Sequence, residues 1–136
     1  MPFEILSEAG GAERWAEEIV ALPRALRDIH YLPDYGRIYR DVHGFIPLLA
    51  LYRSKEGCVL QPFVRRPLCT LPFLASKSDA GAFSDVANAY GYGGPLSNAA
   101  EAITARKLYA QFAACFATWC EQQGVASEFA SLHPLM

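Results

Sequence analysis

Hydrophobic residues recur at helical spacing in three segments of the chain. In segment 12–22 they share one face while glutamates occupy the others, which predicts an amphipathic helix that Pro23 ends. Segment 33–41 shows the same spacing and begins with proline, a residue favoured at the first helical position. The longest such segment runs from residue 99 to about residue 123, where Gly124 is well placed to end a helix. The pattern therefore predicts two short helices and one long helix.

Uninterrupted apolar runs at 44–52 and 57–64 predict two strands. The polar segment between them is only four residues long, which favours an antiparallel hairpin. Pro47 and Pro62 each remove a backbone donor from this hairpin. We therefore expect each proline to lie at a sheet edge or at a bulge.

Shorter strands are predicted at 3–6, 83–87 and 125–132, and the Gly10-Gly11 pair is expected to end the first of them. The resulting order is strand, two helices, hairpin, strand, glycine-rich loop, helix and strand. The 136 residues match the size of one domain and contain no repeat or low-complexity linker. The sequence predicts a single α/β module over residues 1–136.

Composition and charge restrict the function further. Hydrophobic residues make up 52% of the chain and charged residues 19%, so we expect some apolar surface to face a partner. The formal charge of −2 argues against an extended nucleic-acid surface. No apolar run reaches the length of a membrane span, and the first residues do not resemble a signal peptide. The four cysteines form no C-x-x-C pair and have no histidine at metal spacing, which predicts free thiols, no metal site and a cytoplasmic protein.

The segment Tyr90-Gly91-Tyr92-Gly93-Gly94-Pro95 is the clearest candidate for a ligand loop. Its glycines permit positive φ and close approach of a ligand, and its tyrosines can stack or hydrogen-bond. Asn98 and Glu101 then match a capping box, whose helix N-terminus could hold a phosphate or carboxylate. The spacing fits neither a P-loop nor a dinucleotide fingerprint. The alternative is a tight turn whose tyrosines only pack. The predicted substrate-binding residues are Tyr31, Tyr90, Gly91, Tyr92, Gly93 and Gly94.

Two residues near the end of the chain are weak catalytic candidates. His133 could act as a general base, although no acid or nucleophile adjoins it, and a structural hydrogen bond is the alternative. Glu128 is expected to be half-buried on a strand face and to need a partner, so it could serve catalysis or hold the loop. Arg65 and Arg66 could grip an anion, or they could simply end the hairpin in solvent. Tyr31, Tyr35 and Tyr39 predict a packing surface, with one hydroxyl reaching the site.

Segments 28–35, 90–95, 127–129 and 132–135 occur in one order along the chain. In that order they resemble the N-terminal half of proteins related to the Fem peptidoglycan-bridge aminoacyltransferases, within the GNAT acyltransferase superfamily. The resemblance extends from about Phe3 to Leu135. One difference is that no arginine stands between Glu128-Phe129 and His133-Pro134, so a role for that arginine in holding an anionic substrate does not carry over.

The resemblance implies a GNAT-like mixed, mainly antiparallel sheet flanked by helices and ending near the fifth strand. It also implies a module that forms the acceptor-side wall of an acyl or aminoacyl transferase, which joins an amine of a small molecule or peptide to an acyl group. The donor would be acyl-CoA or aminoacyl-tRNA, held by a C-terminal GNAT-like half or a partner subunit. The isolated chain is expected to hold no cofactor, to be inactive and to form a homo-oligomer through its final strand. The alternative is a non-catalytic binding module that needs a partner half.

Overall fold

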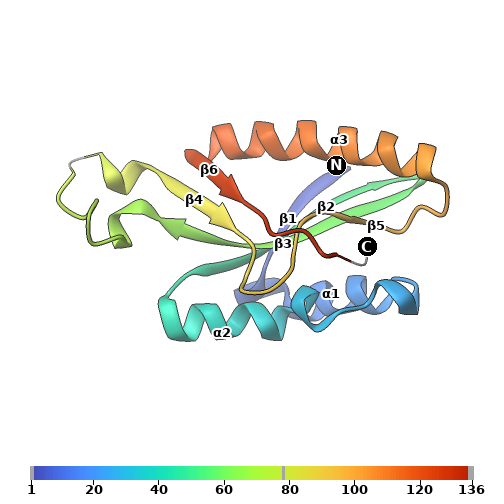
Figure 1. The fold of residues 1–136 in the computed structure, drawn as a ribbon, viewed down its shortest axis with the longest axis horizontal. Helices are drawn as coiled ribbons and strands as arrows, with labels where there is room; N and C mark the ends of the chain where they lie inside the picture. Colours follow the sequence, from blue (N-terminus) through green and yellow to red (C-terminus); the bar gives the residue numbers. More distant parts are fainter. Residues whose placement is uncertain (1, 78, 135–136) are drawn as a thin grey trace.

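A computed structural model describes residues 2–77 and 79–134 and confirms a mixed α/β fold with a mainly antiparallel sheet (Figure 1). Its strands are β1 (Phe3–Ser7), β2 (Ile46–Ser54), β3 (Gly57–Pro67), β4 (Ser84–Ala87), β5 (Leu96–Ser97) and β6 (Val125–Phe129). Its α-helices are α1 (Glu8–Val20), α2 (Pro33–His43) and α3 (Ala102–Gln122), and short 3-10 turns lie at 24–26, 29–31, 68–70 and 80–82. The strand order is β1-β2-β3-β4-β6, and β5 also pairs with β3.

The helices cover both faces of the sheet, with α1 and α2 below it and α3 above it in Figure 1. Trp15 and Ile19 of α1 are fully buried against alternate residues of β2 and β3, as the helical pattern predicts. Phe112 and Phe116 of α3 pack against the intervening residues of the same strands. Because both faces of β2 and β3 are buried, these strands read as continuous apolar runs.

The two hairpin prolines lie where a neighbouring strand is missing, as predicted. β1 pairs with β2 only from Leu48 onwards, so Pro47 lies beyond the end of β1. Pro62 lies between the stretch of β3 that pairs with β5 and the stretch that pairs with β4. On the side where no neighbouring strand pairs, the missing N–H of each proline therefore costs the sheet no hydrogen bond.

β4 and β5 occupy consecutive positions along the same side of β3. Both strands are antiparallel to β3, and the glycine-rich segment 88–95 separates them. The segment therefore interrupts one strand and leaves the sheet as a loop. α3 then carries the chain back so that β6 runs parallel to β4.

Two local predictions about helix ends are wrong. α1 begins at Glu8, so Gly10 and Gly11 lie within the helix and only Gly11 has non-helical dihedral angles. α3 begins at Ala102, and no side chain caps its first turn. The Asn98 side chain instead accepts a hydrogen bond of 2.8 Å from the backbone N–H of Cys58. Asn98 extends the pairing of β5 with β3, so the helix begins only after this segment.

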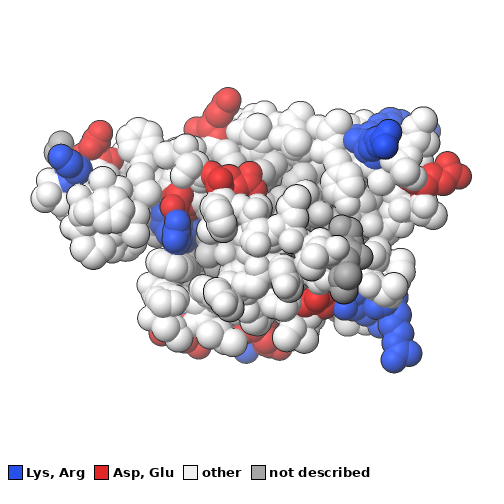
Figure 2. Space-filling model, viewed as in Figure 1, with Lys and Arg blue, Asp and Glu red and all other residues white. Residues whose placement is uncertain are grey.

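β6 is the last strand of the sheet in the described part of the chain. Its exposed side chains include Phe129, with 69% of its surface accessible. In the view of Figure 1 this edge faces the reader, and Figure 2 shows only scattered charged side chains on that face. The molecule therefore presents a sparsely charged strand edge.

Candidate functional site

Tyrosine hydroxyls hold the glycine-rich loop in place. The Tyr31 hydroxyl donates to the carbonyl oxygens of Gly93 and Gly94, at 3.1 Å and 3.3 Å. The Tyr35 hydroxyl donates to the carbonyl of Tyr90, whose N–H donates to the Tyr39 hydroxyl. Burial raises the pKa of Tyr31 to about 12, so its hydroxyl remains a donor at neutral pH. We predicted that one of these three tyrosine hydroxyls reaches the site, whereas all three bond to the loop.

The loop needs glycine for the predicted positive φ angles and also for the close approach of neighbouring side chains. Gly91 and Gly94 have φ angles of +100° and +86°, which other residues rarely adopt. A Cβ atom at Gly91 would lie 2.6 Å from Nε2 of His30, and one at Gly93 would lie 2.4 Å from Cβ of Asn88. The loop backbone therefore packs directly against side chains that a larger residue would displace.

A carboxylate between two imidazole rings lies beneath this loop. Asp28 accepts hydrogen bonds from Nδ1 of His30 and from Nε2 of His133, the latter at 2.9 Å. The backbone N–H of His30 donates to the same carboxylate at 2.9 Å. Burial alone would raise the pKa of Asp28, but the three hydrogen bonds outweigh burial and lower this pKa. Asp28 is therefore a carboxylate at neutral pH and fixes both rings as donors toward it.

His133 joins the end of the described chain to this cluster. Only 8% of its side chain is exposed, and its ring lies 5.2 Å from the ring of Tyr92. The tail before it pairs with the loop, because the Gly93 N–H donates to the carbonyl of Ser131 at 2.8 Å. This environment supports the structural alternative for His133 rather than the role of general base.

We call the largest nearby hollow the loop cleft; its volume is about 810 Å³. His30 and Tyr35 form one wall and the loop forms another, while Arg66 and Phe129 complete the lining. Arg66 is held by two hydrogen bonds to Asp85, so it is not the unpaired anion grip that the sequence allowed. No described carboxylate lines this cleft. The loop cleft can accept a ligand group between an imidazole and a guanidinium.

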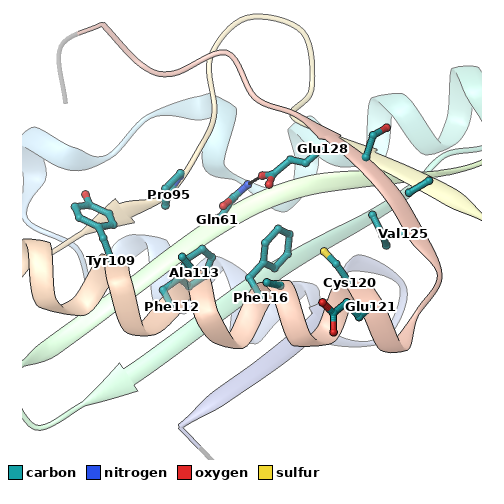
Figure 3. A pocket seen from close by; sticks show the side chains of 13 residues that line it. Gln61, Pro95, Tyr109, Phe112, Ala113, Phe116, Cys120, Glu121, Val125 and Glu128 are labelled. Carbon is teal, nitrogen blue, oxygen red and sulfur yellow. Dashed lines mark hydrogen bonds between the residues drawn. The ribbon is translucent and has the colours of Figure 1, made fainter.

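A second hollow of about 540 Å³ lies between α3 and β6, and we call it the helix cleft (Figure 3). Glu128 lines this cleft, and its carboxylate accepts a 2.7 Å hydrogen bond from the side-chain amide of Gln61. The prediction that Glu128 is half-buried is wrong, because β6 lies at the edge of the sheet and Glu128 is exposed there; its carboxylate nevertheless has a hydrogen-bond partner. That partner is Gln61 of β3 rather than the glycine-rich loop, and Glu128 does not line the loop cleft.

The structure thus separates the residues predicted from sequence. Tyr90, Gly91 and Tyr92 line the loop cleft. Gly93, Tyr31 and His133 line a smaller hollow of about 250 Å³ on the other side of the loop. Sequence reasoning did not select Asp28 and His30 as site residues. Apart from the place of segment 28–35 in the family resemblance, their signal was the Asp-x-His spacing, which lets a carboxylate bond to the ring and backbone two residues later.

Comparisons with protein families, with curated proteins and with solved structures found no match. No cluster of three or more metal-ligating side chains occurs among residues 2–77 and 79–134. Within the same residues, no helix combines the length and the apolar character that crossing a membrane requires. The functional argument therefore depends on the geometry of the two clefts.

Proposed function

We propose that this chain is a GNAT-like, Fem-related module of an acyl or aminoacyl transferase, and that the loop cleft forms the wall that receives the amine acceptor. The observation that carries the proposal is the Asp28–His30 pair beside Gly91 in that cleft. A histidine oriented by a carboxylate is a common arrangement for a general base. The module would work with a C-terminal half or a partner subunit that holds acyl-CoA or aminoacyl-tRNA.

The chemistry follows from the hydrogen bonds of His30. Its Nδ1–H donates to Asp28, so in the neutral ring Nε2 carries the lone pair. This atom lies on the side of Gly91, which lines the cleft. As the amine nitrogen attacks the acyl carbonyl carbon to form the amide C–N bond, Nε2 would take the proton that the nitrogen loses. The C–S bond to coenzyme A, or the C–O bond to tRNA, would then break, and the departing sulfur or oxygen would take up a proton. Asp28 would then stabilise the positive imidazolium through the existing hydrogen bond.

The order of elements gives further support. One strand, two helices, a hairpin and the two strands β4 and β5 precede α3, and the β6 strand after α3 runs parallel to β4. Apart from the short additional strand β5, this is the order expected from the resemblance to GNAT proteins. The glycine-rich loop lies between β4 and α3, where that fold places a ligand-binding turn. Order alone supports a fold, whereas the Asp28–His30 pair supports the chemistry.

A non-catalytic binding module that needs a partner half is the second candidate. The open edge of β6, with its exposed Phe129, favours this alternative because strand edges commonly receive another strand. The two candidates differ in what they require of the loop cleft. A transferase acceptor site must recognise a free amine, whereas a scaffold needs no such selectivity.

The test is a nuclear magnetic resonance titration with L-alaninamide and with its N-acetyl derivative, which lacks the basic amine. We expect L-alaninamide to shift the Nε2 signal of His30 and the amide signal of Gly91, and the acetylated compound to leave both unchanged. His30→Gln should abolish the response at Gly91. His43→Gln is the matched control, because His43 does not line the loop cleft. Equal responses to both compounds, or no response, would contradict the acceptor-site proposal.

A further inference from the structure

The residues that line the helix cleft do not belong to the proposed acceptor site. Phe112 and Phe116 of α3 form its apolar floor, and Ala113 and Ala117 leave it open on the helix side. Val125 and its neighbours in β6 form the opposite wall. Figure 3 shows Phe116 and Cys120 pointing from α3 toward β6. A volume of about 540 Å³ falls in the range of about 300–1,000 Å³ that small-molecule sites occupy.

One polar pair lines this apolar cleft, with Gln61 buried and Glu128 exposed. Gln61 is only 3% exposed, and it lies in the stretch of β3 between the segments paired with β5 and β4. Its amide therefore reaches past the interrupted strand to Glu128, as the dashed line in Figure 3 shows. Among residues 2–77 and 79–134, Glu128 makes no other hydrogen bond or ion pair. One carboxylate oxygen thus remains for a ligand.

The charge of the cleft is negative. Glu121 stands at its border in addition to Glu128, and no lysine or arginine of the described chain lines it. Burial first and Glu128 second raise the pKa of the Cys120 thiol to about 11, while Arg65 opposes this increase. A negative group beside an apolar wall is favourable for a cation and unfavourable for an anion. The loop cleft has no lining carboxylate, and the charge of its one arginine, Arg66, is paired with Asp85.

We propose that the helix cleft binds a small hydrophobic primary amine. The ammonium group would donate to the open carboxylate oxygen of Glu128, whose position the Gln61 amide fixes. The hydrocarbon or aromatic part would lie on Phe112 and Phe116. This site is separate from the loop cleft and does not depend on the transferase proposal. The two proposals can fail independently, because they are tested with different compounds and variants.

Isothermal titration calorimetry with three phenylalkyl compounds of similar length and different head group tests the head-group preference. We expect 4-phenylbutylamine to bind more tightly than 4-phenylbutanol, and 4-phenylbutyrate not to bind. Glu128→Gln should weaken the amine by about two- to fivefold, since Glu128 is exposed and water weakens an ion pair at an exposed carboxylate. The same variant should leave the affinity for the alcohol unchanged. If 4-phenylbutyrate bound as tightly as 4-phenylbutylamine, the proposal would be overturned.

Two tryptophan variants on α3 test the location. Ala117 lines the cleft and Ala114 does not, although both are exposed on the helix. Ala117→Trp should fill the cleft and abolish binding of both the amine and the alcohol. Ala114→Trp adds the same side chain outside the cleft and should leave both affinities unchanged. Thermal melting of each variant confirms its fold. Unchanged amine binding by folded Ala117→Trp would place the ligand elsewhere and overturn the assignment.

Discussion

Replacing Gly91 with alanine tests the packing of the loop on the Asp28–His30 pair. The new Cβ atom would lie 2.6 Å from Nε2 and 2.8 Å from Cδ2 of His30, which is closer than real Cβ contacts. The imidazole cannot turn away freely, because Nδ1 is bonded to Asp28 and Tyr35 and Tyr92 pack against the ring. Relief of the clash therefore requires loss of the hydrogen bond to Asp28.

Two costs add in this variant. Holding alanine at the φ of +100° found for Gly91 costs about 1–2 kcal/mol. Breaking the hydrogen bond between His30 and the Asp28 carboxylate costs about 1.5–3 kcal/mol. The free energy of unfolding should therefore fall by about 2.5–5 kcal/mol. For a chain of this size, that loss lowers the melting temperature by about 10–20 °C.

Chemical denaturation of Gly91→Ala, His30→Ala and the double variant separates the two costs. In the His30→Ala background, Gly91→Ala should lower the free energy of unfolding only by the backbone cost, about 1–2 kcal/mol. The difference between this cost and the cost of Gly91→Ala in the wild type is the coupling energy, about 1.5–3 kcal/mol. Gly10→Ala is the control, since Gly10 lies in α1 with open space around it. This variant should raise the free energy of unfolding by about 0.5–1 kcal/mol. A Gly91→Ala cost that is the same in both backgrounds would show that His30 does not pack against the loop as described.

Two further predictions concern pH and association. Because the pKa of Asp28 is lowered in the folded state, its contribution to stability should be complete above its ordinary value near 3.8 and should disappear as the pH falls through the lower folded value. The stability difference between the wild type and Asp28→Asn, measured by urea denaturation, should therefore shrink below about pH 4; a constant difference would argue against this linkage. We also expect the open β6 edge to associate, so sedimentation over a concentration series should show a dimer or larger species that Phe129→Lys weakens. A wild type that stays monomeric at high concentration would contradict association through this edge.

Local patterns in the sequence were sufficient for most of the elements. The hairpin and the three helices were predicted from periodicity, because spacing along the chain determines which side chains share a face. The prolines of the hairpin also indicated correctly where strand pairing is absent. The end of α3 near Gln123 was correct, while its start was not, since Asn98 bonds to the neighbouring strand rather than to the helix.

The glycine-rich loop was recognisable from sequence because its function as a close-approach segment is a property of glycine itself. The residues that it approaches were not recognisable. His133 lies 105 residues from Asp28 along the chain, and their contact arises only because the tail after β6 pairs with the loop. Asp28 and His30 likewise became site candidates only through the tertiary structure, which brings the loop next to them.

Only the tertiary structure decided which side of the sheet each candidate serves. Residues of β6 alternate in direction, so Phe129 faces the loop cleft and Glu128 faces the helix cleft, although they are adjacent in sequence. The sequence by itself determined most of the elements, the order of the predicted elements and the position of the glycine-rich loop. The interruption of one strand along β3 determined that the loop leaves the sheet, that Gln61 reaches Glu128 and that two separate clefts form beside one strand. Such contacts join distant segments, and no local pattern encodes them.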